Sequence, residues 1–572
     1  MRASNSANGA EGHTDWHAVN WRYAQRRVRN LRQRIFKASQ AGDLKTVRSL
    51  QKLMLRSHSN TLLSVRRVTQ DNRGKYTPGV DREVIKTPEA KGKLVEWLSS
   101  VTSWKAKPVR RVYIPKANGR SRPLGIPTVR DRCLQAKVKN ALEPEWEARF
   151  EASSYGFRPG RGPHDALVAV HSLACATGNK RWVVDADIHG AFDTIDHGAL
   201  LNAVGRFPAR ELLKQWLKAG YIENAKRSDT PAGTPQGGII SPLLANVALH
   251  GMEEALNIRR YRNGRPVKEK NTRALVRYAD DFVVFCKSEA DAKAAIDMLH
   301  QWLASRGLEL SQDKTRLVHV QDGFDFLGIH TRLYKSAHTK NGVICLQTPS
   351  KTSVRRFRQN VNTVFATHKG NNAQALIHAL APILRGWGNY FRPFVSTKTF
   401  GNLDDWLFHR LCYWAKRTHN CKSRRWRDAR YFGMNAPGRK DRHVFTDPVS
   451  GVYLMKLMWL GIRRHIIVRN AASVDDPSLR EYWATRAAKY CDLSPRRYAV
   501  AHSQNFKCAA CGLTLFNGER LHLHHLIRDK HDPDREHRRH LRMLHYDCHI
   551  YGVHGTQGNN NPKWVEGLLL DA

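Results

Sequence analysis

Three features of exported or membrane proteins are missing from this sequence. No run of about 18 or more apolar residues occurs, so no segment is predicted to span a membrane. The first residues, Met-Arg-Ala-Ser-Asn-Ser, contain no apolar stretch that would indicate a secretory signal. Seven of the ten cysteines stand singly along the chain: Cys133, Cys175, Cys286, Cys345, Cys412, Cys421 and Cys491. Scattered cysteines are typical of reduced thiols, so we expect a cytoplasmic protein, bacterial or organellar.

Acidic residues are scarce relative to basic ones. The chain has 50 Asp and Glu against 95 Lys and Arg, which leaves a formal net charge of +45. A charge of this size predicts strong, salt-sensitive attraction to phosphate backbones, although it separates neither RNA from DNA nor catalysis from packaging. The 572 residues and 41% hydrophobic content are enough for several domains with their own cores. We therefore expect an ordered protein associated with the nucleoid or with a ribonucleoprotein.

Two adjacent carboxylates interrupt an apolar run at residues 275–285, Leu-Val-Arg-Tyr-Ala-Asp-Asp-Phe-Val-Val-Phe. Apolar residues alternate on both sides, which predicts two strands with Asp280 and Asp281 at the turn between them. Like charges placed side by side cost free energy unless a positive charge lies against them. Because carboxylate oxygens suit hard Mg2+, the pair predicts a metal site. A solvated Asp-Asp turn is the plainer alternative.

A second acidic strand lies upstream, at residues 181–193, and carries Asp185 and Asp187. Their side chains point to one face of an extended strand because they lie two residues apart. Phosphoryl transfer to a 3′-hydroxyl uses two metal ions about 3.5–4 Å apart. Asp187 together with Asp280 and Asp281 could hold two Mg2+ ions, whereas Asp185 is equally consistent with a structural role.

Seven motifs in a fixed order resemble those of the group II intron reverse transcriptases and maturases. Besides the two acidic segments, they lie at residues 113–128, 154–160, 234–246, 307–315 and 323–329. Any one of them is weak, but seven in order are very improbable by chance. The resemblance covers most of the chain and implies an RNA-directed DNA polymerase.

The resemblance also implies which residues bind the incoming dNTP. Lys116 and Arg122, with Arg110, flank a Gly-containing turn and could grip a triphosphate; coating an RNA-facing surface is the alternative. Phe192, five positions after Asp187, corresponds to the ring that excludes a ribose 2′-hydroxyl, although Phe is also common in cores. Gln236 and the two glycines after it permit close backbone approach to a nucleotide or base pair.

Basic helical patterns flank these motifs. Residues 15–57 combine Arg-rich positions, among them Arg32, with a broken apolar stripe that includes Leu44, which predicts an extension that docks intron RNA, or else a solvated helix face. Residues 351–419 have helical periodicity with many aromatic residues and resemble the maturase thumb, where packing is favoured for Trp387 and Tyr390 over base stacking. The basic stretch that begins at Cys421 predicts an extended DNA-binding segment or a basic linker.

Cysteines and histidines gather near the C-terminus. Four of them have the types and spacing of a structural Zn2+ site: Cys508, Cys511, His545 and Cys548. Between them lie His524 and His525, which must point to opposite faces of a strand. One can then bind a catalytic metal while the other removes a proton from water. A structural knuckle alone explains the cysteines but not this pair of histidines.

This block resembles an HNH endonuclease domain. The resemblance makes His525 the general base, and His524 and His549 the ligands of a catalytic divalent metal. Two residues depart from the family pattern. His540 stands where Asn is usual, which puts nuclease activity in doubt, and His545 replaces a cysteine in the knuckle.

The implied fold is α+β and multidomain: right-hand polymerase fingers and palm with an antiparallel palm sheet, an α-helical thumb, and a small ββα-metal HNH domain. The predicted divisions are a basic helical extension and start of the fingers (1–95), fingers and palm (96–340), thumb or maturase domain (341–420), basic DNA-binding region (421–495) and HNH domain (496–572).

The implied function joins two activities. A nick in target DNA exposes a 3′-hydroxyl, and a reverse transcriptase needs one as primer, so the hypothesis is target-primed copying of group II intron RNA during intron homing. Assistance to splicing rests on the resemblance alone. A host-adopted or defence-type reverse transcriptase and a splicing-only RNA-binding factor are the alternatives. The sequence leaves open whether one or two copies act on each intron RNA.

Overall fold

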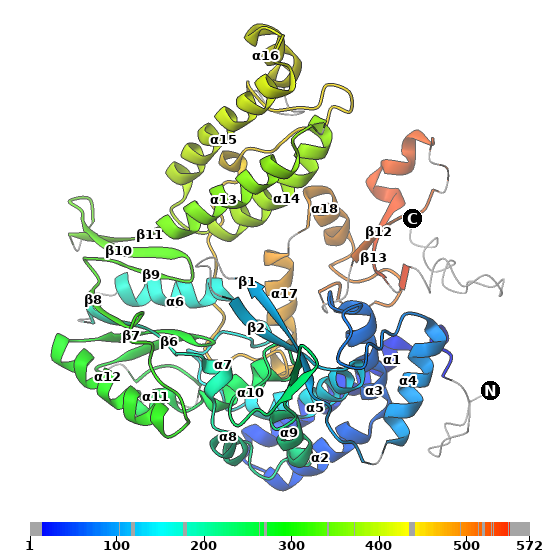
Figure 1. Ribbon diagram of the computed structural model, residues 1–572, viewed down its shortest axis with the longest axis vertical. Helices are drawn as coiled ribbons and strands as arrows, with labels where there is room; N and C mark the ends of the chain where they lie inside the picture. Colours follow the sequence, from blue (N-terminus) through cyan, green and yellow to red (C-terminus); the bar gives the residue numbers. More distant parts are fainter. Residues whose placement is uncertain are drawn as a thin grey trace.

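The computed structural model describes residues 14–549, shown as a ribbon in Figure 1, except for short gaps. The gaps are residues 102, 116–120, 176–179, 262, 268–270, 340–341, 371, 434–440, 492, 513, 517–520, 528, 530 and 547. Lys116 falls in one of them, so its predicted contact with a triphosphate lies outside the described residues. Among the described residues, no helix has both the length and the apolar character needed to cross a membrane.

The N-terminal helices pack around one long helix, α5 (Val129–Glu147). They are α1 (Trp21–Gln40), α2 (Leu44–Arg56), α3 (His58–Arg66) with a π-helical turn (Arg67–Asp71), and α4 (Pro88–Ser100). Asn20, Asp43 and Ser57 cap the first three, each accepting a backbone N–H from the first turn. Most of the predicted apolar stripe is buried, but Leu44 is 55% exposed at the first position of α2, so its predicted core role is wrong.

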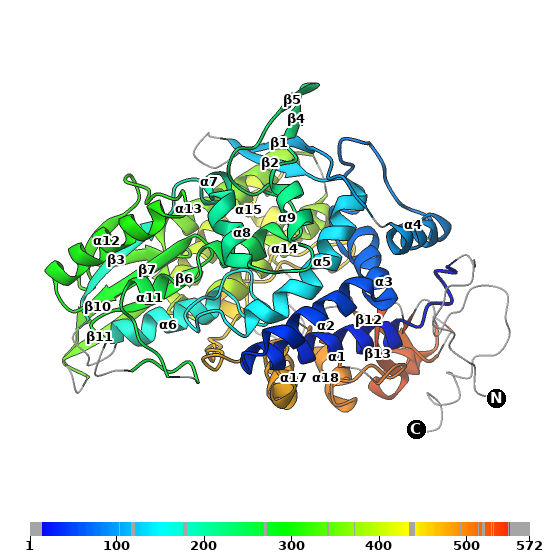
Figure 2. The same ribbon diagram turned by 90° about the horizontal axis from the view of Figure 1, so that it is seen from below.

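A four-stranded sheet forms the fingers, with strand order β2-β1-β4-β5. The strands are β1 (Val109–Pro115), β2 (Ser121–Ile126), β4 (Tyr221–Glu223) and β5 (Lys226–Ser228). In Figure 2 the β4–β5 hairpin projects from the body of the protein. Strand β1 pairs with β2 so that Arg110 lies opposite Ile126 and Ile114 opposite Arg122. Because side chains alternate along a strand, Arg110 and Arg122 lie on the same face of this hairpin.

The palm is an antiparallel four-stranded sheet with strand order β6-β7-β3-β8. Its strands are β3 (Trp182–Asp187), β6 (Ala274–Tyr278), β7 (Asp281–Cys286) and β8 (Arg316–His319). Both faces are buried, which explains the near-continuous apolar runs. Val184 and Phe282 belong to one core with the N-terminal helices, and Val183 and Phe285 to a second core with the thumb. The sheet thus joins the two halves of the molecule.

Helices cover the palm and link its strands. They are α6 (Pro163–Cys175), α7 (Ala191–Thr194), α8 (His197–Val204), α9 (Arg210–Leu217), α10 (Ser241–Ala248), α11 (Met252–Ala255) and α12 (Glu289–Ala304). Helix α6 packs against β6 of the palm and also against β10 and β11 of the neighbouring sheet. That sheet has the order β11-β10-β9 and consists of β9 (Phe324–Phe326), β10 (Ile329–Lys335) and β11 (Val343–Pro349).

Long helices form the thumb, which stands above the palm in Figure 1. They are α13 (Lys351–Thr367), α14 (Ala373–Phe391) and α15 (Thr397–Thr418), followed by α16 (Arg424–Phe432). Trp387 packs as expected, with its ring 4.8 Å from that of Phe357 and 4.4 Å from that of Phe391. Tyr390 donates a hydrogen bond to Leu327 O at 2.8 Å. The extended conformation predicted after Cys421 is wrong at α16, which Ser423 caps.

Residues 442–490, here called the return segment, run back from the thumb to the palm. The segment includes 3-10 turns at Leu457–Trp459 and Pro477–Leu479 and helix α17 (Arg480–Tyr490). Buried Asp165 of α6 holds His465 and Arg486 at 2.9 and 2.6 Å. Asp475 pairs with Arg32 of α1 at 2.7 Å, and Figure 2 shows α17 close to α1. The return segment therefore packs on the body of the protein.

A small unit follows the return segment. It consists of α18 (Pro495–Ser503), β12 (Leu521–His525) and β13 (Leu541–His545), with 3-10 turns at Pro533–Glu536 and Arg538–His540. The strands form an antiparallel hairpin. Its core is small: Val500, Ala501, Cys508, Cys511, Leu515, Leu541, Met543 and Leu544. Residues 546, 548 and 549, directly after β13, are helical, which is where the third element of the expected ββα fold would begin; any continuation lies outside the described residues.

Candidate functional site

Three acidic side chains from distant parts of the chain meet at one edge of the palm sheet. Asp187 ends β3 and lies directly opposite Asp281, the first residue of β7. Asp280 stands in the tight turn that joins β6 to β7. Ala279, the other turn residue, has a φ of +59°, a conformation that non-glycine residues rarely adopt. The structure thus brings together the carboxylates that the sequence singled out.

Buried polar groups support this turn from behind. Arg277, fully buried, donates hydrogen bonds to Ala279 O and Asn246 Oδ1, both at 3.2 Å. Asn246 in turn donates to Gly156 O at 2.8 Å. A Cβ at Gly156 would lie 2.3 Å from Ala279 N, so only glycine allows this approach. Sequence reasoning gave these three residues no role, although the Arg within the apolar strand 274–278 was a usable signal.

The carboxylates repel one another in this position. Loss of hydration, with Asp280 and Asp187 nearby, raises the pKa of Asp281 to about 7. Loss of hydration also raises the pKa of Asp280, an effect that Arg122 opposes. Lys314 makes an ion pair with Asp187, although its own side chain is largely exposed. The edge of the sheet therefore favours a cation, and the chain itself supplies one lysine there.

Asp185 pairs with a different strand residue from Asp187. It lies opposite Arg316 of β8, and loss of hydration raises the pKa of its carboxyl to about 6. Its charge also interacts with those of Asp187 and Asp281, so a structural role and a role in the metal site both stay predictions for Asp185.

The residues predicted to bind a nucleotide surround the carboxylates in part. Arg122 is exposed and close enough to Asp280 to influence its pKa. Arg110 shares a face of the hairpin with Arg122 and is partly buried. Its neighbour Arg111 stacks on another residue: its guanidinium lies 3.9 Å from the Tyr221 ring centre. Arg110 and Arg122 thus remain available on the side of the hairpin that serves the site.

Phe192 and Gln236 meet beside the same site. Phe192 is partly buried, with its ring centre 6.1 Å from that of Phe157. Its carbonyl accepts a hydrogen bond of 2.6 Å from Thr234 N, which ties the loop that precedes α10 to α7. Gln236 Nε2 donates to Asp193 Oδ2 at 3.3 Å. Hydrogen bonds to Thr234 and Asp193 therefore hold the backbone of Phe192 and the side-chain amide of Gln236.

The C-terminal unit gathers the four residues of the predicted zinc knuckle. Their ligand atoms all lie within 4.8 Å of one another: Cys508, Cys511, His545 and Cys548. Cys511 Sγ is 3.3 Å from His545 Nδ1. Hydrogen bonds from Cys511 and Cys548 hold the pKa of the Cys508 thiol far below its usual value. Two thiols and an imidazole around one thiolate form a suitable donor set for Zn2+.

The histidines of β12 divide between two faces. His524 lies with its ring 5.1 Å from that of His549, on the same side as His522. His525 points the other way and lies 3.1 Å from Glu536 Oε1. Loss of hydration, with Arg535 and Arg496 nearby, lowers the pKa of His525 and leaves a neutral imidazole at neutral pH. The predicted ligands are thus on one face and the predicted base on the other.

His540 stands where the family pattern has Asn. Its side chain makes no hydrogen bond to His525, the predicted general base, among the described residues. Its carbonyl accepts a 2.8 Å hydrogen bond from Leu526 N, and its ring accepts one from Arg539 at 2.8 Å. The backbone of His540 therefore braces the end of β12 next to His525.

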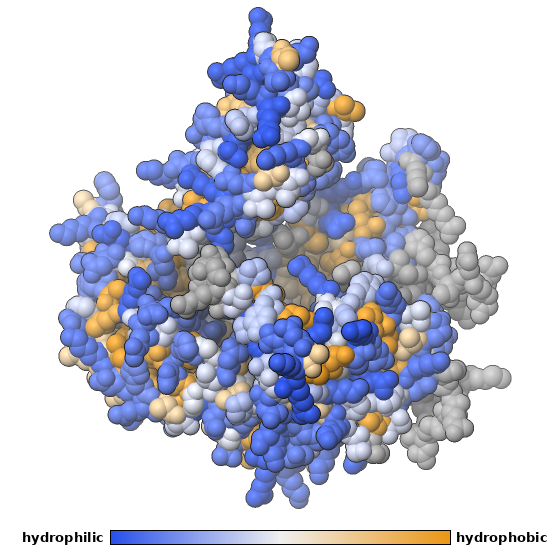
Figure 3. All heavy atoms as spheres, in the orientation of Figure 1, coloured by the Kyte–Doolittle hydropathy of each residue, from blue (hydrophilic) through white to orange (hydrophobic). Residues whose placement is uncertain are grey.

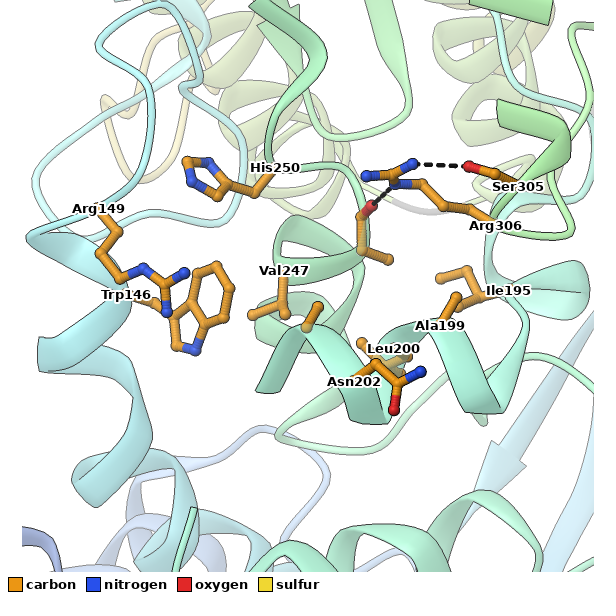
Figure 4. A pocket seen from close by; sticks show the side chains of 12 residues that line it. Trp146, Arg149, Ile195, Ala199, Leu200, Asn202, Val247, His250, Ser305 and Arg306 are labelled. Atoms are coloured by element: carbon orange, nitrogen blue, oxygen red, sulfur yellow. Dashed lines mark hydrogen bonds between the residues drawn. The ribbon is translucent and has the colours of Figure 1, made fainter. Parts of the chain in front are cut away.

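The pocket in Figure 4 lies elsewhere, between α5, α8 and α10. Arg306 closes one side and donates to Ala248 O at 3.2 Å and Ser305 Oγ at 2.9 Å. No carboxylate or cysteine lines this pocket, nor does any residue singled out from the sequence. We assign it no chemistry.

Comparison with known proteins gives three matching family models. "Reverse transcriptase (RNA-dependent DNA polymerase)" matches residues 114–331, "N-terminal domain of reverse transcriptase" residues 16–98, and "Group II intron, maturase-specific domain" residues 354–432. The match at 114–331 covers the fingers and the palm, and the match at 354–432 covers the thumb.

Two relatives extend these matches. Protein YkfC of Escherichia coli is 36% identical over 315 residues, which span 48% of this chain and 81% of the relative. Group II intron-encoded protein LtrA of Lactococcus lactis is 32% identical over 356 residues, 50% of this chain and 59% of LtrA. A solved telomerase from Candida albicans, in complex with a fragment of telomeric RNA, covers 55% of this chain and 59% of its own, at a TM-score of 0.32 and 13% identity, too low to carry an argument.

Fold, carboxylates and matches together define a reverse transcriptase. The chain belongs to the group II intron reverse transcriptase and maturase family. The resemblance stated from the motifs is confirmed to that extent, and so is the antiparallel palm sheet. The three matched segments end at residue 432, so the nuclease assignment stays a prediction, as do the domain boundaries.

Proposed function

We propose that this protein copies RNA into DNA at the palm carboxylates. One observation carries the proposal: Asp187 pairs directly with Asp281 across the sheet, and Asp280 occupies the adjoining turn. Oxygen donors and the raised pKa of Asp281 fit hard divalent cations. When bound there by these three residues, two Mg2+ ions would activate the primer 3′-hydroxyl and stabilise the leaving oxygen.

The remaining residues of the site would place the incoming dNTP. Arg122 and Arg110 share a face of the fingers hairpin, and their guanidinium groups suit phosphate oxygens. Phe192 would stand against the sugar and exclude a 2′-hydroxyl. Gln236 follows the loop that packs on β2, where Gly125 N donates to Gln236 O at 2.6 Å. The chain's own side chains at this site would therefore position the incoming dNTP and select it against a ribonucleotide.

A second proposal concerns the C-terminal unit, which we infer to nick DNA. Cys508, Cys511, His545 and Cys548 would hold a structural Zn2+ ion. His524 and His549 would bind a catalytic divalent metal, while His525, neutral and on the opposite face, would take a proton from water. The support is the grouping of the four ligand atoms and the separation of the histidines.

The third element of the proposal is the RNA partner. Five basic side chains of α1 are exposed: Arg22, Arg26, Arg27, Arg34 and Lys37. The thumb adds others: Lys351, Arg355, Arg356, Lys416 and Arg417. The face in Figure 3 is hollowed below the thumb, and hydrophilic side chains cover most of the thumb's surface. Together with the maturase-specific match, this favours group II intron RNA, with splicing assistance and target-primed copying as the resulting functions. Arg32 is not part of this surface, because it pairs with Glu143 and Asp475.

Paired variants test the two active sites separately. Asp280→Ala should lower extension of a DNA primer on an RNA template in Mg2+ by about 1,000-fold or more, because metal stabilisation is worth several kcal/mol. His525→Ala should leave extension unchanged and slow the nicking of supercoiled plasmid DNA by about 100-fold or more, the usual contribution of a general base.

Exposed residues of the same types serve as controls. Asp322→Ala and His531→Ala should change neither activity, because both side chains lie in exposed turns. Retention of cDNA synthesis in Asp280→Ala would falsify the polymerase assignment. Loss of both activities in both variants would show that Asp280 and His525 are needed for the fold instead of for catalysis.

A further inference from the structure

A second cluster of sulfur and imidazole groups lies far from the C-terminal unit. His171 and Cys175 come from the last turns of α6, and Cys345 comes from β11. Their ligand atoms all lie within 4.8 Å of one another. Within the described residues, this group and the knuckle are the two sets of His, Cys, Asp or Glu that meet this criterion. Cys175 and Cys345 stand singly along the sequence, and the fold brings them together.

Local structure brings the three residues together. His171 and Cys175 are one helical turn apart and therefore share a face of α6. Cys345 and Gln347 are both buried because alternate residues of β11 face α6. Gln347 Nε2 donates to Leu167 O at 2.9 Å, which fixes the strand against the helix. The approach of Cys345 to α6 is thus set by packing, and no bond between the sulfurs is required.

The spacing matches a tetrahedral metal site. With Zn–S bonds of about 2.3 Å and Zn–N bonds of about 2.0 Å, neighbouring sulfur and nitrogen ligands stand about 3.5 Å apart and two sulfurs about 3.8 Å apart. His171 Nε2 lies 3.5 Å from Cys175 Sγ.

We propose that His171, Cys175 and Cys345 bind a zinc ion. Two thiolates and one imidazole supply three ligands, and the exposure of Cys175 leaves the fourth position to water. Soft sulfur ligands select such a metal against Mg2+, so this site differs in chemistry from the palm carboxylates. Cys345 is buried and Cys175 exposed, which places the ion at the surface end of the cluster.

The position of the site gives the ion a structural consequence. Helix α6 belongs to the palm and is the anchor of the return segment through Asp165. Strand β11 ends at Pro349, two residues before the first thumb helix begins. A zinc ion between α6 and β11 would therefore fasten the base of the thumb to the palm. This inference does not depend on the proposed polymerase or nuclease activity.

Metal content of the full-length protein tests the proposal. The protein is purified after expression with added ZnSO4 and dialysed without chelator, and zinc per chain is measured by mass spectrometry. Wild type should hold one equivalent more than Cys175→Ser and one more than His171→Gln. The control Cys421→Ser, which removes an exposed cysteine outside the cluster, should keep the wild-type content.

Titration with Co2+ gives a second measurement. The thiolate-to-cobalt charge-transfer absorbance should be weaker in Cys175→Ser than in wild type, and Cys511→Ser should lose the separate contribution of the knuckle. Equal zinc in wild type, Cys175→Ser and His171→Gln, with each variant folded by circular dichroism, overturns the proposal. So does a Cys175–Cys345 disulfide found in the purified wild-type protein.

Discussion

The palm site and the C-terminal site are built in opposite ways. At the palm, strands fixed by two large cores carry Asp187 and Asp281 to adjacent positions, and buried Arg277 shapes the β6–β7 turn that carries Asp280. In the C-terminal unit the core is a handful of small apolar side chains, and two of its members are the proposed ligands Cys508 and Cys511. The first site is held by the fold before any metal arrives. In the second, the proposed metal ligands are themselves part of the small core.

The difference predicts that metal loss has unequal effects. Structural zinc contributes about 10 kcal/mol or more to the folding of small zinc domains, which the small C-terminal core does not replace. The palm carboxylates, in contrast, should keep their positions without metal because the sheet determines them. Three predictions test or refine this comparison.

The largest effect is expected from Cys511→Ser. The variant should lose the order of the C-terminal unit, with rapid proteolytic cleavage beyond about residue 495, while primer extension on RNA stays within about twofold of wild type. Limited proteolysis and primer extension measure the two halves in one preparation. Cys421→Ser is the matched control. Loss of extension together with the C-terminal unit would mean that the two sites fold as one.

A smaller effect is expected from Phe192→Ala in the palm. Removing the ring should raise the incorporation of ribonucleotides relative to deoxyribonucleotides by about 10- to 100-fold, since a steric contact of this size is worth about 1–3 kcal/mol. The ratio of kcat/KM for the two nucleotides measures the change. Phe192→Tyr preserves the bulk and should preserve the selectivity. An unchanged ratio in the Ala variant would leave Phe192 as a packing residue.

The smallest effect concerns Asp185→Asn. Burial raises the pKa of Asp185 to about 6 from an ordinary 3.8. An acid whose pKa is raised in the folded state stabilises the protein while it is protonated, and that stability is lost as the pH rises from about 4 to 6. Asn cannot ionise, so the variant should be more stable than wild type at pH 7, by about 1–3 kcal/mol, with little difference at pH 4.

Thermal unfolding in chelator between pH 4 and 7 gives this comparison. Asp187→Asn is the contrast, because it should abolish primer extension, whereas Asp185→Asn should retain it. A loss of extension in Asp185→Asn would make Asp185 part of the metal site.

Alternation and motif order made the palm predictable. Apolar residues on both sides of Asp280 and Asp281 predicted the β6–β7 hairpin, and the period of two predicted the shared face of Asp185 and Asp187. The knuckle was predictable for a similar reason, since spacing and residue type define it. In these regions the local pattern and the tertiary structure agree.

Long-range contacts were not predictable from one sequence. Basic composition after Cys421 fits a DNA-binding segment or a basic linker equally well, and the docking of the return segment depends on buried Asp165, some 300 positions from His465 and Arg486. Arg32 looked like one more RNA-binding residue until its partners Glu143 and Asp475 were visible. Pairing of distant charges leaves no local periodicity, so composition alone could not reveal it.

The return segment has a mechanical consequence. The return segment connects the thumb to the C-terminal unit, and Asp165 and Arg32 bind it through ion pairs. The chain is therefore anchored to the body of the protein before it reaches the proposed nuclease. Tilting of the thumb helices along a duplex need not drag that unit with it. The palm site and the proposed nuclease site can therefore keep a constant separation if the thumb moves.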